Sequence, residues 1–199
     1  MNGLQMTVDP RWVFVTRGDD ITAEVDRQLG VIPPPGAEAT WQELRDDSAQ
    51  LLLDELNDGA EWSALFMMQE ADGSLVAARA SARFEPTLTT EIGDLYDEIL
   101  VAHRDDTYQA TVQMIETPAG VAVQLKRLLQ QGEEQPVEYH GYLVPSSTGG
   151  LLVECFCAPS GFAGAWGSSL ESMVLSLRPD VQTATDSISL VMYVYSGSD

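Results

Sequence analysis

Much of the chain consists of short runs in which apolar and polar residues alternate, and turn-forming residues bound each run. This pattern is typical of β-strands with one buried face. The runs cover residues 11–16, 62–70, 74–84, 111–116, 121–129, 138–144, 151–158 and 188–195. Three short turn segments, 71–73, 118–120 and 145–150, join six of these runs in pairs. We therefore predict three β-hairpins, one strand before them and one strand after them.

Four other segments, 21–29, 40–58, 90–104 and 162–178, carry apolar residues at helical spacing. Thr40 and Glu43 have the spacing of a capping box, and Gly59 is a suitable helix stop, so these residues predict the ends of the second helix. The intervening segment 31–36 contains three consecutive prolines. Proline fits neither the interior of a helix nor a central strand, so we interpret this segment as a loop.

Hairpins that alternate with helices, rather than strict strand–helix repeats, indicate an α+β fold with a mostly antiparallel sheet and helices packed against it. A length of 199 residues suits a single domain, 1–199. In this interpretation residues 1–36 form an N-terminal strand, a helix and the proline-rich loop. Residues 181–199 form the C-terminal strand and a polar tail.

The segment from Tyr139 to Arg178 resembles the C-terminal part of Mog1/PsbP-like domains. The resemblance lies in the strand 139–144, the second strand with its Ala-Pro break at 150–159, and the amphipathic helix that ends in Ser176-Leu177-Arg178. It implies an antiparallel sheet covered by helices, in a group whose members are mostly non-enzymatic binding or assembly-assisting proteins or are uncharacterised. The acidic first ninety residues and the strand after Pro179 depart from the pattern. No functional residue is therefore transferred from that family.

Charge excludes some partners. The chain has 31 acidic and 10 basic side chains and a net charge of −21, and its densest basic site is the pair Lys126 and Arg127. Nucleic acids and anionic membranes both require a cluster of cations, so we expect neither as a partner. The same charge permits a basic protein partner or a cation, but it also simply keeps a protein soluble.

The chain shows no secretory signal and no apolar run of about 18 residues, so we expect no membrane span. Its only cysteines, Cys155 and Cys157, lie two residues apart in one predicted strand, where a disulfide rarely forms. We therefore expect a reducing, cytoplasmic location.

No motif for nucleotide phosphates, zinc proteolysis, calcium loops or a nucleophile elbow occurs in the chain. Ser160 fits a helix N-cap better than a nucleophile. The paired acids are adjacent in sequence, so their side chains diverge in a strand or helix. We therefore predict no catalytic residue and no cofactor.

One candidate metal site remains. A symmetric hairpin about residues 145–150 places His140 opposite Cys155 and Glu138 opposite Cys157, all on one face. These residue types can bind a tetrahedral cation. However, zinc thiolates usually come from turns, and Val153 on the same face favours small core residues instead.

The last predicted strand, 188–195, is apolar on both faces, so it is either a buried strand or an exposed edge that pairs with a partner or a second copy. In the latter case Val191, Tyr193 and Tyr195 are the candidate interaction residues. The sequence thus favours a non-catalytic protein-interaction or assembly domain. The alternatives are an acidic inhibitor or immunity-type protein that binds a basic partner, and a small-molecule binder or enzyme with an unfamiliar site.

Overall fold

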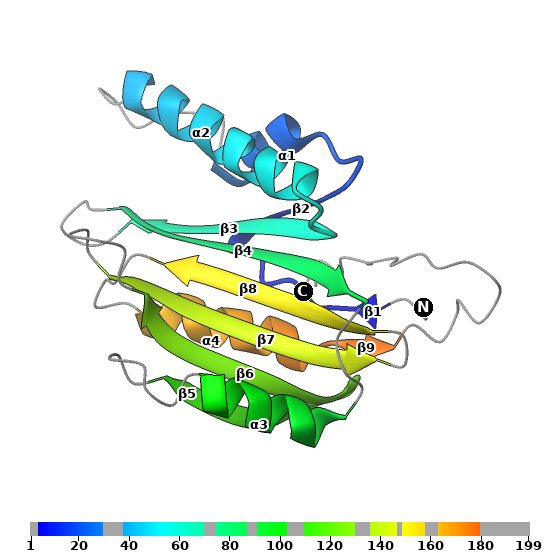
Figure 1. The fold of residues 1–199 in the computed structure, drawn as a ribbon. Helices are drawn as coiled ribbons and strands as arrows, with labels where there is room; N and C mark the ends of the chain where they lie inside the picture. The colour runs from blue at the N-terminus through cyan, green and yellow to red at the C-terminus, as the bar shows by residue number, and fades with distance from the viewer. Residues whose placement is uncertain are drawn as a thin grey trace.

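The fold is an antiparallel sheet with helices on both faces (Figure 1). The computed structural model describes residues 4–29, 38–69, 75–86, 91–102, 110–129, 136–146, 149–157 and 163–179. Its strands are β1 (Leu4–Gln5), β2 (Trp12–Thr16), β3 (Trp62–Gln69), β4 (Leu75–Glu85), β5 (Thr111–Thr117), β6 (Gly120–Leu129), β7 (Val137–Ser146), β8 (Gly149–Cys157) and β9 (Arg178–Pro179). Its helices are α1 (Ile21–Leu29), α2 (Glu38–Asn57), α3 (Ile92–Ala102) and α4 (Ala163–Leu175).

Seven strands form one sheet in the order β2-β3-β4-β8-β7-β6-β5, and every neighbouring pair is antiparallel. The three predicted hairpins are confirmed as β3–β4, β5–β6 and β7–β8. The central contact, between β4 and β8, joins hairpins that lie about 70 residues apart in the sequence. The predicted α+β class with a mostly antiparallel sheet is therefore confirmed.

One face of the sheet, which we call face A, lies against α4 and the N-terminal segment (Figure 1). Small side chains from β4 and β8 fill its centre, where Ala80 lies opposite Cys155. A chain of polar contacts also connects α4 with β2 and with the segment before it. The indole Nε1 of Trp12 donates to Ser169 Oγ at 2.9 Å, and that hydroxyl donates to Asp9 at 2.6 Å. The helix is thus positioned by hydrogen bonds as well as by apolar packing.

The opposite face, face B, is covered from its two ends (Figure 1). At the β2–β3 end, Val25 of α1 and Leu52 of α2 pack on Val13 and Leu65. At the other end, Leu95 of α3 packs near Val123 of β6 and Leu143 of β7. The middle strands β4 and β8 present charged and aromatic side chains on this face.

The ends of two helices differ from the sequence prediction, and one predicted strand lies in a part of the chain that the structure does not describe. The second helix begins at Glu38, so Thr40 lies within its first turn and the predicted capping box is wrong, although Gly59 does end the helix with a φ of +99°. The fourth helix ends at Leu175, and Arg178–Pro179 forms the short strand β9, which pairs with β1. The predicted strand 188–195 lies outside the described residues. Among the helices of the described part, none has the length and apolarity needed to cross a membrane.

Gly149 at the start of β8 provides a test of this fold. It has a φ of +143°, and a Cβ atom there would lie 2.6 Å from the carbonyl oxygen of Glu85 and 2.8 Å from Cα of Pro86. Because these are backbone atoms, we expect Gly149→Ala to lower the free energy of unfolding by about 1–3 kcal/mol. Thermal or urea unfolding followed by circular dichroism would measure this change.

The control is Gly93→Ala in α3, where an added Cβ would meet nothing within 4 Å. This variant should unfold at the wild-type midpoint or about 0.5–1 kcal/mol more stably, because alanine favours a helix. Equal stability of the two variants would contradict the close packing of β8 against the end of β4.

Candidate functional site

The structure brings together the four residues that the sequence singled out as metal-ligand candidates. His140 lies opposite Cys155 and Glu138 lies opposite Cys157, as predicted. His140 is only 4% exposed, and both cysteines are buried as well. Nε2 of His140 lies 3.0 Å from Oε1 of Glu138. A Cβ atom on Gly167 of α4 would come within 3.4 Å of the imidazole ring, so the helix backbone packs directly against this cluster.

Burial shifts the pKa values of the histidine and both cysteines towards their neutral forms. Burial raises the pKa of the Cys155 thiol, and it raises that of Cys157 to about 11, so both thiols are protonated near neutral pH. Burial also lowers the pKa of His140 and outweighs the opposite effect of the Glu138 carboxylate, which accepts a hydrogen bond from the imidazole. Within the described residues, no group of three or more His, Cys, Asp or Glu side chains is arranged to hold a metal ion. His140 and the two cysteines are buried in the core beneath α4, and Glu138 is partly exposed at its edge.

The interaction residues predicted in the C-terminal strand, Val191, Tyr193 and Tyr195, lie outside the described residues. They remain predictions.

A different set of side chains lies on face B, where two arginines and a phenylalanine are partly exposed and a tyrosine between them is buried. Four residues lie directly opposite one another across four consecutive strands: Arg79 of β4, Phe156 of β8, Tyr139 of β7 and Arg127 of β6. The Arg79 guanidinium lies 5.0 Å from the centroid of the Phe156 ring, the two aromatic rings are 5.1 Å apart, and the Arg127 guanidinium lies 5.5 Å from the Tyr139 ring. We call these four residues the cation–aromatic row.

The middle of the row depends on one glycine. The Tyr139 phenol lies over Gly141 of the same strand, where a Cβ atom would lie 2.6 Å from the phenol oxygen. From this position the hydroxyl donates a 3.0 Å hydrogen bond to Glu154 of β8. Burial and the neighbouring Glu154 carboxylate raise the pKa of Tyr139, so the phenol stays neutral. The absence of a side chain at Gly141 thus leaves room for the ring, and the hydrogen bond to Glu154 orients it.

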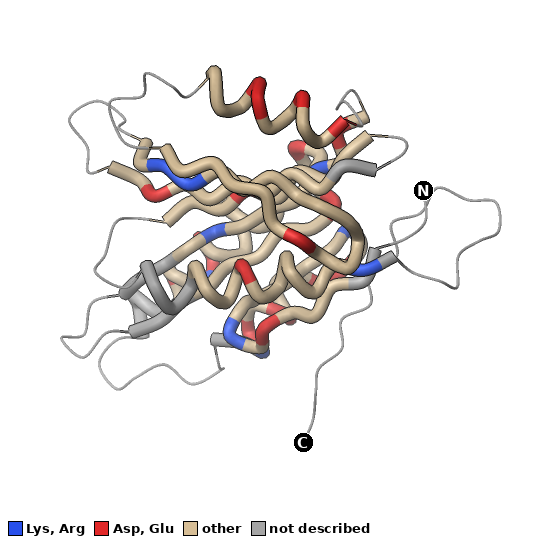
Figure 2. Tube along the Cα trace, turned by 90° about the horizontal axis from the view of Figure 1, so that it is seen from below, with Lys and Arg blue, Asp and Glu red and all other residues tan. Residues whose placement is uncertain are grey.

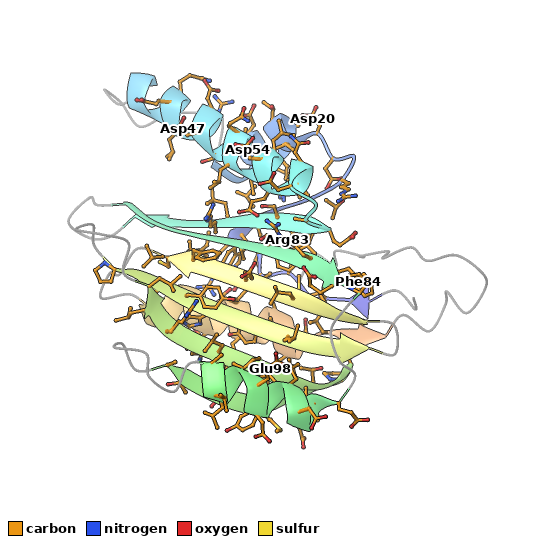
Figure 3. The ribbon with its side chains drawn as sticks, viewed as in Figure 1. Asp20, Asp47, Asp54, Arg83, Phe84 and Glu98 are labelled. Carbon is orange, nitrogen blue, oxygen red and sulfur yellow. The ribbon has the colours of Figure 1, made fainter. Side chains whose placement is uncertain are left out.

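At the β4 end of the row, Glu55 of α2 forms an ion pair with Arg79. One of its carboxylate oxygens lies 3.3 Å from Arg79 and the other lies 3.1 Å from Arg83, two residues further along β4. The Arg83 side chain also donates to the backbone carbonyl of Asp58, just after α2; Figure 3 labels Arg83 on the strand beneath this helix. One carboxylate therefore serves two guanidinium groups.

The Arg79 side chain remains partly accessible. It is 42% exposed, whereas that of Glu55 is only 14% exposed. Arg79 can therefore contact a second anion without losing the first.

No protein-family model matches this chain, and no curated protein sequence matches it either. The resemblance of residues 139–178 to Mog1/PsbP-like domains therefore remains a prediction. Any statement about function depends on the geometry above.

The sequence analysis missed the cation–aromatic row although its signal was present. Arg79 and Arg83 alternate with the alanines of β4, and the hairpin register that placed His140 opposite Cys155 also places Tyr139 opposite Phe156. Only the pairing of β4 with β8 brings Arg79 to this position, and nothing in the sequence specified that contact.

Chemically, the row offers planar cations and aromatic rings. Such groups bind carboxylates, other anions and flat apolar groups by ion pairing and stacking. The row can therefore bind such a group, with the carboxylates of Glu55 and Glu154 holding its side chains in place.

Because His140 is buried, we expect the free energy of unfolding to depend on pH. Because the folded-state pKa of His140 lies below its ordinary value of 6.5, the unfolded chain takes up a proton that the folded chain resists. Stability is therefore fully present above pH 6.5 and falls as the pH drops from there towards the folded pKa, by at most about 1.4 kcal/mol per pH unit for one proton. Urea unfolding between pH 7.5 and 5 measures this slope.

His140→Gln should flatten the slope in this pH range, because glutamine does not titrate. Glu138, Glu171 and Lys126, which act electrostatically on His140, are present in both proteins, so the difference between the two slopes reports on His140. An unchanged slope in the variant would mean that His140 accepts its proton freely in the folded protein.

Proposed function

We propose that this protein is a non-catalytic protein-interaction domain that binds its partner over the cation–aromatic row on face B. The observation that carries the proposal is the position of the row. Arg79, Phe156, Tyr139 and Arg127 line up across four strands between the two covered ends of the face. Aromatic and arginine side chains are the residue types most enriched where interfaces gain their binding energy.

The distribution of charge over the molecule supports the row as the binding surface. Acidic residues are spread over the described chain and basic residues are few (Figure 2). Three of the basic side chains, Arg79 and Arg83 of β4 and Arg127 of β6, nevertheless lie on the same face of the sheet, although β8 and β7 separate the two strands. A partner segment that carries carboxylates is attracted here and repelled by most of the remaining surface. The row therefore favours an acidic or aromatic segment as the contacting part of the partner.

The test compares variants of equal charge. Arg79→Gln/Arg127→Gln removes both cations from the row, and Arg27→Gln/Arg178→Gln removes two exposed cations elsewhere. Wild type and both variants are immobilised, exposed to an extract of the cells that produce the protein, and analysed by quantitative mass spectrometry. At least one protein retained by wild type and by the control should fall about tenfold or more with the row variant, which corresponds to about 1.4 kcal/mol.

Circular dichroism melts of the same proteins show whether each variant is folded. The proposal fails if the row variant is folded and retains the same proteins as wild type. It also fails if wild type retains nothing beyond the bare matrix.

A second candidate function is an acidic inhibitor or immunity-type protein that covers a basic partner. It is favoured by the outward-facing carboxylates of α2, of which Asp47 and Asp54 are labelled in Figure 3. Long-range attraction by such a surface raises the association rate and makes it depend on salt.

Asp47→Asn/Asp54→Asn separates the two candidates in the same experiment. If the acidic surface carries binding, this variant loses the partner and the row variant keeps it. The association rate measured with the purified partner should then fall about tenfold or more between 20 and 300 mM salt. If the row carries binding, the acidic variant retains the partner.

A further inference from the structure

A depression of about 460 Å³ lies at the C-terminal end of α2. The turn between β2 and α1 forms one wall with Arg17, Gly18 and Asp19, and α2 forms the other. Its volume is within the range of ligand-binding pockets in proteins. All of its lining residues belong to the described part of the chain.

The lining separates into an apolar floor and a polar rim. Ile21, Leu53 and Leu56 provide aliphatic surface, and Leu53 is 39% exposed although it is a large apolar residue. Arg17, Asp19 and Asn57 at the rim are exposed. An occupant would therefore contact aliphatic groups on one side and polar groups on the other.

Arg17 is the distinctive residue of this rim. Its Nε donates to the carbonyl oxygen of Ala60 at 3.2 Å, which fixes the plane of the guanidinium. Among the residues that the structure describes, no carboxylate forms an ion pair with Arg17. This differs from Arg11, Arg27 and Arg45, each of which is paired with an aspartate or glutamate.

Asp19 is the one acidic residue in the lining, and its carboxylate is hydrogen-bonded to Thr16. One oxygen of the Asp19 carboxylate accepts hydrogen bonds from the backbone N–H and the hydroxyl of Thr16, at 2.7 and 2.9 Å. The two terminal nitrogens of Arg17 thus keep donors for an external carboxylate, in a chain whose net charge is −21.

The openness of the depression indicates what kind of molecule fits. Free small ligands usually have 70–90% of their surface buried in their sites. Here most of the rim is exposed to solvent, so an occupant remains partly in water. Such a site suits a single residue presented by a larger molecule, which gains the rest of its affinity elsewhere.

We propose that this depression binds the C-terminal residue of a partner protein, an aliphatic residue whose side chain contacts Ile21, Leu53 and Leu56 and whose carboxylate pairs with Arg17. A C-terminal leucine, isoleucine or valine carries both groups on the same residue. This inference rests on the proposed interaction function and adds an anchor to it. The depression and the row flank the same end of α2, since Leu56 and Asn57 line the former and Glu55 supports the latter.

The test uses the full chain labelled with ¹⁵N and titrated with N-acetyl-L-leucine, which mimics a C-terminal residue. The backbone amide signals of Gly18, Asp19 and Asn57 should shift and saturate, with a dissociation constant in the millimolar range for so small a ligand. N-acetyl-L-leucinamide, which lacks the carboxylate, should bind about tenfold more weakly.

Three variants assign the contacts. Arg17→Gln should abolish the preference for the carboxylate, while Arg27→Gln, which removes an arginine from the exposed side of α1, should keep it. Leu53→Ser should weaken both ligands, because its side chain is part of the aliphatic surface. The inference is overturned if N-acetyl-L-leucine shifts none of the pocket amides, or if Arg17→Gln binds it as wild type does.

The two proposals fail separately. Loss of the cellular partner by the row variant, with no response of the pocket to N-acetyl-L-leucine, removes the anchor and leaves the interaction domain. Binding of N-acetyl-L-leucine at Arg17, with no partner lost by the row variant, supports the pocket and overturns the row.

Discussion

The antiparallel pairing of β4 with β8 decides which side chains of this protein reach water. In a strand, successive side chains point to opposite faces, so the register assigns every residue of both strands at once. Ala80 and Cys155 meet on face A beneath α4, and therefore Arg79 and Phe156 meet on face B. A slip by one residue would place two arginines in the core and expose the alanines. Burying unpaired charges is so costly that this register is strongly specified.

The helices add to this difference between the apolar face A and the charged face B. Face A is closed by α4, which is tied to β2 through the contact of Ser169 with Trp12 and Asp9. The guanidinium of Arg11 lowers the pKa of Asp9, so this acceptor stays ionised at neutral pH. Among the described residues, face B is covered at its ends, and Glu55 links α2 to β4 there through Arg79 and Arg83. Between α2 and α3 the side chains of Arg79, Arg83 and Phe156 are partly exposed.

The sequence predicted the parts of this arrangement that local patterns control. Alternating residues and turn segments gave the three hairpins, and hairpin symmetry gave the register that places His140 opposite Cys155. The same patterns could not predict how hairpins distant in sequence join, so the contact of Arg79 with Phe156 was missed. The two-residue strands β1 and β9 carry no periodic signal at all.

Local signals also failed where tertiary context was stronger. Thr40 and Glu43 match a capping box, yet α2 continues two residues further towards the N-terminus and begins at Glu38. The depression beside Arg17 depends on how the turn between β2 and α1 approaches the end of α2. The spatial relation of a turn to a helix some 35 residues later is set by packing, since the apolar face of α2 has to reach Leu65 on the sheet.

Thiols and charged groups are distributed differently over the two faces of the sheet. The thiols of Cys155 and Cys157 lie under α4, where burial keeps them protonated and therefore poor nucleophiles. The described groups that are at least partly exposed beside α2 and on face B include guanidiniums, carboxylates and the ring of Phe156. Guanidiniums do not titrate near neutral pH, so they can bind an anion but cannot transfer a proton to a substrate. The separation of the two faces that stabilises the sheet thus buries both thiols and leaves guanidinium groups partly exposed for binding an anion.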